Sequence, residues 1–174
     1  MKDLPLLMRI PDDLVPLSVI AVGGVMLVII TIIHGFGLDL IVGRYTRRAE
    51  EIRHTSWRPS RAVLLFAGTI LLMLFLHLGE ISFWALVLYA GGLVANYHQA
   101  AYFAANTYTT LGMGNMVLPH TWHEMSPMIA ISGLFAFAWT TSEMFNIVGT
   151  QRDVVHELWS RRRQRIASQP ATQR

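Results

Sequence analysis

Residues 97–119 read YHQAAYFAANTYTTLGMGNMVLP, and the two halves of this stretch differ in composition. The first half contains four alanines and three aromatic side chains over residues 98–109, with neither glycine nor proline, so it predicts a short helix there. The second half has glycines at alternate positions, Gly112 and Gly114, and ends at Pro119. Because glycine adopts positive φ without steric cost, this pattern allows successive carbonyl groups to point to the same side.

Three long apolar blocks lie outward from this stretch, at residues 14–43, 62–94 and 125–150. At about 1.5 Å per residue, each block is long enough as a helix to cross a hydrocarbon core of about 30 Å. Only 14% of the residues are charged, against about 25% in soluble domains. The sequence therefore predicts an all-α membrane protein with three transmembrane helices. The block 62–94 is compatible with one long helix or with two short ones broken near Gly79.

The basic residues flank the apolar blocks instead of interrupting them. The linker 44–61 carries six Arg against two Glu, and the tail 151–174 carries six Arg against two acids. By the positive-inside rule, both segments are cytoplasmic and the N-terminal segment 1–13 is external. Residues 97–119 must then begin and end on the external side, which a re-entrant helix and loop would satisfy. A fourth span would put the two Arg clusters on opposite sides. We expect a multi-pass protein of the plasma membrane (the cell inner membrane).

Non-helical backbone at membrane depth is tolerated only where protein shields it or where it lines a hydrated path. Several chains around one axis would present stacked rings of carbonyl oxygen to a dehydrated cation. The chain is too short to hold four pore repeats, so one pore of this kind requires oligomerisation.

Residues 107–115, TYTTLGMGN, match the pattern T-x-T-T-x-G-Y-G-D at most positions, and they resemble the filter of the potassium-channel superfamily. The resemblance extends over about residues 62–148. More narrowly, the sequence is similar to small bacterial ion channels, which have an extra N-terminal helix and a segment like EISFWALVLY before the pore. The resemblance implies a homotetramer around one central pore. The implied organisation is an extra transmembrane helix 14–43, a linker 44–61, a pore domain 62–150 (outer helix 62–94, pore helix 98–109, filter 110–115, inner helix 125–150) and a tail 151–174.

The resemblance also implies which residues bind the permeant ion. Oxygens of the filter would do so, and Thr109, Asn115 and Tyr108 would support it. The implied ion-binding residues are Thr110, Leu111, Gly112, Met113 and Gly114.

Two filter residues depart from the family pattern, because Met113 replaces its aromatic residue and Asn115 replaces its acid. In the family, those two groups hydrogen-bond to the surrounding wall, whereas a thioether is flexible and a weak acceptor. Three functions therefore stay open: a passive K⁺ channel, a non-selective monovalent cation channel, and a non-conducting membrane subunit with the pore fold.

The third apolar block contains residues that predict a gate or a cavity. Gly133 occupies the place where family inner helices carry a glycine, which serves either bending or close packing. Phe137, Thr140 and Met144 share its helical face by spacing. If that face lines the pore, Phe137 and Met144 would form a hydrophobic constriction; the alternative is a face that packs against another subunit. Glu143 is costly in lipid, so it should face a cavity, a neighbour or the interface.

Two further groups of polar residues have competing interpretations. Glu80 lies near His77 and Trp84 on one helix by spacing, which predicts either a proton-sensitive support behind the pore helix or a structural hydrogen bond between helices. His120 and His123 follow the filter and would either bind a metal or line a solvated vestibule.

Several function classes are excluded or disfavoured. Cysteine is absent, and no nucleophile–base pair, phosphate-binding loop or metal-ligand spacing occurs, so we expect no enzyme, no cofactor and no transition-metal site. We expect no nucleic-acid partner, because the basic residues flank apolar blocks. The expected partners are other copies of the chain, membrane lipids and monovalent cations, K⁺ first and Na⁺ second.

Overall fold

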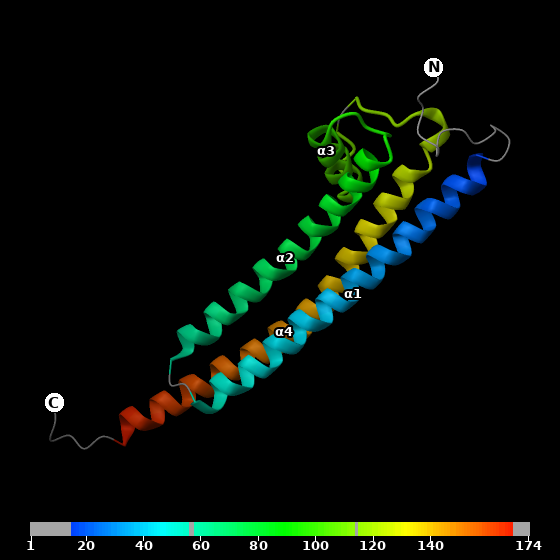
Figure 1. Cartoon of the computed structure of the whole chain (residues 1–174). Helices are drawn as coiled ribbons and strands as arrows, with labels where there is room; N and C mark the ends of the chain where they lie inside the picture. Colours follow the sequence, from blue (N-terminus) through cyan, green and yellow to red (C-terminus); the bar gives the residue numbers. More distant parts are fainter. Residues whose placement is uncertain (1–14, 56–57, 114, 169–174) are drawn as a thin grey trace. The chain divides into compact units, whose positions relative to one another are not determined.

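The computed structural model describes residues 15–55, 58–113 and 115–168, and these residues form helices without any strand. The elements are α1 (Val15–Thr55), α2 (Pro59–Ala90), α3 (Tyr97–Tyr108), the 3-10 turn η2 (His120–Trp122) and α4 (Met125–Ala167) (Figure 1). Three helices, α1, α2 and α4, are long and apolar enough to cross a membrane. The prediction of an all-α chain with three such helices is confirmed. The expected external segment 1–13 lies outside the described residues.

The long helices extend past the apolar blocks from which they were predicted. α1 continues to Thr55, so most of the linker 44–61 is helical, and α4 continues to Ala167 through the start of the tail. The polar extension of α1 has no glycine or proline between Gly43 and Pro59, and residues 44–55 include four Arg and two Glu, which favour helix. Hydropathy marks where a helix is apolar, and it does not mark where the helix ends.

α2 is one continuous helix that passes through Gly79 and ends at Ala90. Its first residue is Pro59, which suits this position because the first-turn N–H groups of a helix have no intrahelical partner. At its end, Gly92 adopts φ 72°. The N–H of Gly92 bonds to the Tyr89 carbonyl at 3.0 Å, and the N–H of Leu93 bonds to the Leu88 carbonyl at 3.0 Å. This is a Schellman motif with glycine in the left-handed position.

The chain divides into two compact units. The first contains Met1–Phe36 and Phe75–Ala138, and the second contains Gly37–Leu74 and Trp139–Arg174. The first unit holds α3 and a core of buried side chains from all four helices. Trp84 of α2 donates a 2.9 Å hydrogen bond from Nε1 to the hydroxyl of Ser132 on α4 inside this core. The largest buried side chains there are Trp84, Tyr108, Ile30, Leu88, Met125 and Ile129.

The second unit is held by contacts between α1 and α4. Tyr45 is buried, and its hydroxyl donates a 3.1 Å hydrogen bond to the side-chain oxygen of Gln151. Nearer the end of α1, Arg53 forms an ion pair with Glu157, which also pairs with Arg161. The guanidinium of Arg161 also donates a 2.7 Å hydrogen bond to the carbonyl oxygen of Arg53.

Large apolar side chains are exposed along α1, α2 and α4. A helix that is apolar around much of its circumference is typical of a buried or membrane-spanning segment. The exposed side chains include Ile32, Phe36, Leu64, Phe75, Leu134 and Phe145. The surface of these helices therefore agrees with their length in indicating spans.

Candidate functional site

The C-terminus of α3 carries an unusual backbone at the start of the predicted filter. The N–H of Thr110 bonds to the Thr107 carbonyl at 3.0 Å, and the N–H of Leu111 bonds to the Asn106 carbonyl at 2.8 Å. Thr110 adopts φ 55°, so this is the same Schellman motif that ends α2, with threonine in the left-handed position. Positive φ in a β-branched residue is a genuine outlier and stores strain of about 1–3 kcal/mol.

Residues 111–113 and Asn115 of the predicted filter lie outside any helix and are exposed. Gly112 also has positive φ, at 66°, so left-handed backbone recurs two residues after Thr110. Leu111 is 61% exposed and Met113 is 66% exposed. Asn115 is exposed as well, whereas Gly114 lies outside the described residues. The prediction that these residues bind ions stays a prediction.

The two residues that precede the filter have defined partners. The hydroxyl of Thr109 donates a 2.7 Å hydrogen bond to the carbonyl of Ala105, which satisfies a group at the helix end. Tyr108, which precedes Thr109, is fully buried in the first unit. Its phenol enters a cluster of polar side chains among the apolar helices.

This cluster contains Tyr108 of α3, Glu80 and His77 of α2, and His34 of α1, all buried. The phenol of Tyr108 lies 2.5 Å from Glu80 Oε2 and 2.9 Å from His77 Nδ1. The other carboxylate oxygen, Glu80 Oε1, lies 2.7 Å from His34 Nδ1. A buried polar group costs free energy unless it is bonded, and each of these groups has a partner.

The bonding pattern assigns proton positions when Glu80 is ionised. A carboxylate is an acceptor only, so the hydroxyl of Tyr108 donates to Glu80 Oε2. That hydroxyl has a single hydrogen, and therefore His77 Nδ1 must donate to the Tyr108 oxygen. By the same argument, His34 Nδ1 donates to Glu80 Oε1. Two donors, one from α1 and one from α3, thus hold the carboxylate of Glu80 on α2, while His77 donates to the phenol. The last residue of α3 is thereby tied to α2.

The cluster could also hold a metal ion. Ligand atoms of His34, His77 and Glu80 lie within 4.8 Å of one another, and all three residues are buried. Two imidazoles and a carboxylate are donors that suit zinc or another divalent transition metal. The hydrogen bonds described above already connect these donors with one another and with Tyr108. The expectation that the chain has no transition-metal site stays a prediction.

Gly133 lies directly against α3. A Cβ atom at this position would lie 2.0 Å from the Tyr108 carbonyl oxygen and 2.9 Å from its carbonyl carbon. Glycine is therefore required for α4 to approach the backbone at the end of α3. This geometry favours the close-packing role of Gly133 over a hinge, and α4 is continuous through it.

Phe137, one turn after Gly133, packs on the polar cluster of its own chain. Its ring stacks on His77 with centroids 4.4 Å apart and meets the Tyr108 ring edge-on at 5.7 Å. The predicted constriction would need this ring to face a pore. The geometry instead indicates that Phe137 covers the cluster, and its role as a gate stays a prediction.

The remaining predicted gate or cavity residues lie in the second unit, on the later part of α4. Glu143 is partly exposed and accepts a 3.3 Å hydrogen bond from the side-chain amide of Asn146. Thr140 and Met144 are also partly exposed. Their predicted role as a gate or cavity stays a prediction.

Of the two competing interpretations of Glu80, the buried hydrogen bond between helices is present, to both α1 and α3. Trp84 bonds to Ser132 instead of to Glu80. Sequence reasoning missed His34 as a cluster member. The available signal was a histidine in the middle of an apolar span, since such residues usually face a partner. His120 and His123 are exposed, with ring centroids 5.2 Å apart.

No protein-family model, curated protein or solved structure matches this chain. The resemblance of residues 107–115 to a potassium-channel filter therefore rests on the sequence pattern alone.

Proposed function

We propose that the chain is the subunit of a homotetrameric channel that conducts K⁺ passively across a membrane. The observation that carries the proposal is the strained backbone of Thr110 at the end of α3. This short helix lies in the chain between two helices able to span a membrane.

The choice of threonine at this position supports a function for its hydroxyl. The same motif at the end of α2 uses Gly92, which adopts positive φ without strain. Glycine at position 110 would cap α3 equally well and would remove the strain. Strain of this kind persists mainly at functional sites, where the side chain is needed. In the proposed channel, the hydroxyl and carbonyl of Thr110 contribute to an ion site.

The filter loop supports an arrangement of several chains around one axis. Left-handed backbone at Thr110 and Gly112 alternates with Leu111 between them. Such alternation lets successive carbonyls face the same side, and four copies would form rings of oxygen around a dehydrated cation. The side chains of Leu111 and Met113 are largely exposed in a single chain, and neighbouring subunits would cover them.

The polar cluster supports the same proposal because it fixes the residue that precedes the filter. Glu80 and His77 hold the phenol of Tyr108 from one side, and the backbone of α4 at Gly133 contacts Tyr108 from another. A binding loop needs supports whose own positions are set by packing and hydrogen bonds. In the proposed channel, this anchor keeps the filter at its working width.

The second candidate is a non-selective monovalent cation channel. The side chains of Met113 and Asn115 make no hydrogen bond within the described part of the chain. A filter without an anchored wall at these two positions can widen, and a wider filter discriminates K⁺ from Na⁺ poorly.

The test is a flux assay on the full chain reconstituted into liposomes, which compares K⁺, Na⁺ and a large organic cation. K⁺ flux far above Na⁺ flux, abolished by Gly112→Asp, would support the K⁺ channel. Equal flux of K⁺ and Na⁺, also abolished by Gly112→Asp, would support the non-selective channel. Absence of flux from folded tetramers, or flux that Gly112→Asp leaves intact, would count against conduction through this loop.

A further inference from the structure

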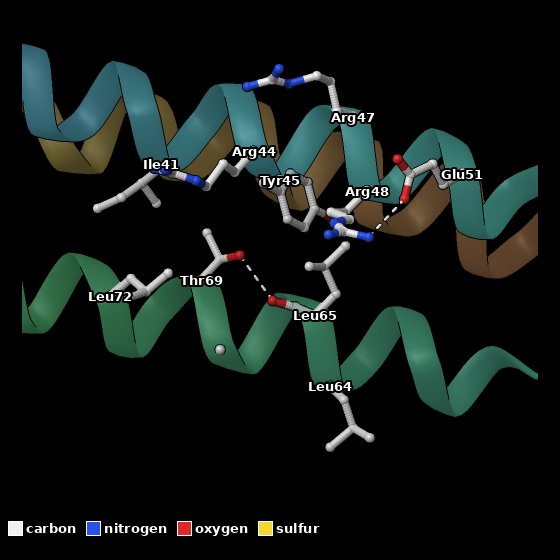
Figure 2. Close-up of a pocket in the computed structure, with 11 residues that line it drawn as sticks. Ile41, Arg44, Tyr45, Arg47, Arg48, Glu51, Leu64, Leu65, Thr69 and Leu72 are labelled. Atoms are coloured by element: carbon white, nitrogen blue, oxygen red, sulfur yellow. Dashed lines mark hydrogen bonds and ion pairs between the residues drawn. The ribbon is translucent and has the colours of Figure 1, made fainter.

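The second unit contains a groove between α1 and α2 with a volume of about 810 Å³ (Figure 2). Its two walls differ in chemistry. The α1 wall carries Arg44, Arg47 and Arg48 with a single acid, Glu51. The α2 wall carries Leu64, Leu65 and Leu72. A basic wall that faces an apolar wall suits a ligand that is itself both anionic and apolar.

The guanidinium groups of this groove have donors available for an anion. Arg44 has no ion-pair partner within the described segments of the chain. Arg48 pairs with Glu51 at 3.1 Å, but both side chains are mostly exposed, at 70% and 60%. Exposed pairs of this kind contribute little, and an Arg keeps further N–H donors for a second oxyanion. The groove therefore carries an excess of positive charge.

The positions of the side chains define where a ligand would lie. Figure 2 shows Arg44 and Arg48 along α1, and Leu65 and Thr69 pointing from α2 toward α1. The hydroxyl of Thr69 donates to the Leu65 carbonyl at 2.9 Å, so this polar group is satisfied and leaves the α2 wall apolar. Arg47 extends from the side of α1 that faces away from α2, at the rim.

The groove also lies next to the boundary between apolar and polar sequence on each of its two helices. On α1, Arg44 directly follows the apolar block 14–43. On α2, the apolar block begins at Ala62, just after Arg61. In a membrane-spanning chain, this boundary is the depth of the lipid headgroups. Basic pockets between spanning helices at this depth are suited to phosphate headgroups.

We propose that this groove binds one anionic glycerophospholipid, with its phosphate on Arg44 and Arg48 and its acyl chains on Leu65 and Leu72. The volume falls within the range of about 300–1,000 Å³ that is typical of small-molecule sites, which is enough for a headgroup and the first part of the chains. A soluble phosphate would leave the apolar wall uncovered, and a zwitterionic lipid would leave the excess charge unpaired. The site does not depend on ion conduction, so its failure and the failure of the proposed channel are separate results.

The test uses the full chain purified in detergent and native mass spectrometry with added dioleoyl phosphatidylglycerol or dioleoyl phosphatidylcholine. Phosphatidylglycerol should bind in preference to phosphatidylcholine. The double variant Arg44→Gln, Arg48→Gln should weaken phosphatidylglycerol binding about tenfold or more, because charge-assisted hydrogen bonds are lost. The matched double variant Arg163→Gln, Arg165→Gln removes the same charge from α4 and should have little effect.

Three further variants test the shape of the groove and its charge separately. Gly68→Leu fills the groove and keeps every Arg, and a Cβ at this position meets no atom within 4 Å. It should weaken lipid binding, whereas Gly79→Leu, equally unhindered on the same helix but outside the groove, should not. Glu51→Gln should strengthen binding because it removes the competing carboxylate.

Three results would overturn the proposal. The first is equal binding of the two lipids, and the second is equal weakening by both Arg double variants. The third is displacement of phosphatidylglycerol by an equal concentration of glycerol phosphate, which would identify a site for soluble phosphate instead of lipid.

Discussion

The hydroxyl of Tyr108 donates a 2.5 Å hydrogen bond to Glu80 Oε2, and this bond joins the last residue of α3 to the middle of α2. Thr109 and Thr110 follow immediately, so the bond fixes the chain at the point where α3 ends and the predicted filter loop begins. The same phenol oxygen accepts from His77 at 2.9 Å. Tyr108 thus connects the polar cluster to the chain directly before the predicted filter loop.

Tyr108→Phe should destabilise the first unit and disturb the loop. The substitution keeps the ring that packs on Phe137, but it removes the hydroxyl that donates to the buried Glu80 Oε2. A buried polar group left unpaired costs about 1–3 kcal/mol. We expect a lower unfolding temperature in detergent, measured by circular dichroism, and a lower K⁺ flux in liposomes.

Tyr102→Phe is the matched control for this change. Tyr102 lies on the same helix, and its side chain is 54% exposed. Removal of its hydroxyl should leave the unfolding temperature nearly unchanged. If Tyr108→Phe and Tyr102→Phe behave alike, the cluster does not support the loop.

Gly133→Ala should be destabilising, although alanine normally favours helix over glycine. The added Cβ would lie 2.0 Å from the Tyr108 carbonyl oxygen, which belongs to backbone and cannot rotate away. Overpacking of this kind costs about 1–3 kcal/mol. The expected result is a lower unfolding temperature, measured in the same detergent by circular dichroism.

Gly149→Ala on the same helix should have the opposite effect on stability. A Cβ at position 149 meets no atom within 4 Å, so the helix should gain about 0.5–1 kcal/mol from the lost backbone freedom of glycine. A stabilising Gly133→Ala variant would mean that α4 does not approach α3 as closely as described.

The sequence was sufficient to predict the long helices and the short helix before the filter. The apolar blocks predicted α1, α2 and α4, and the composition of residues 98–109 predicted α3 to within one residue at each end. These features depend on local composition and length, which are visible in one chain. The end of α1 beyond Gly43 was not predicted, because a polar helical extension has no hydropathy signal.

The composition of the polar cluster could be predicted only in part. Glu80 and His77 are three residues apart on one helix, so their proximity follows from helical spacing. The contribution of His34 depends on the register between α1 and α2, and that of Tyr108 on how α3 packs against them. Neither register can be derived from a single sequence. The packing of Gly133 on Tyr108 likewise depends on how α3 and α4 pack together, so a single sequence does not predict it.

Thr110→Gly should stabilise the end of α3 and impair the proposed ion site. Glycine removes the strain of positive φ, which is about 1–3 kcal/mol. It also removes the hydroxyl that the proposed channel uses as a ligand. The expected result is a higher unfolding temperature together with a lower ratio of K⁺ to Na⁺ flux.

Thr110→Ser is the control for this variant, because it keeps the hydroxyl and removes the branched methyl group. Its selectivity should stay near that of the natural chain. Equal selectivity of the Gly and Ser variants would show that the hydroxyl of Thr110 is not a ligand.

The double variant Met113→Tyr, Asn115→Asp should raise the ratio of K⁺ to Na⁺ flux in liposomes. It restores the two residues at which the filter departs from the potassium-channel pattern, and both of the natural side chains are exposed. A phenol and a carboxylate can each hydrogen-bond to surrounding groups, whereas a thioether is a weak acceptor. A better anchored loop resists widening, so Na⁺ should lose more flux than K⁺. The single variants separate the two contributions, and Val117→Tyr, an exposed apolar position after the filter, controls for the added aromatic ring. A ratio that does not change in the double variant would mean that the width of the filter is set elsewhere, and the anchor formed by Tyr108 and Glu80 would then be the next place to test.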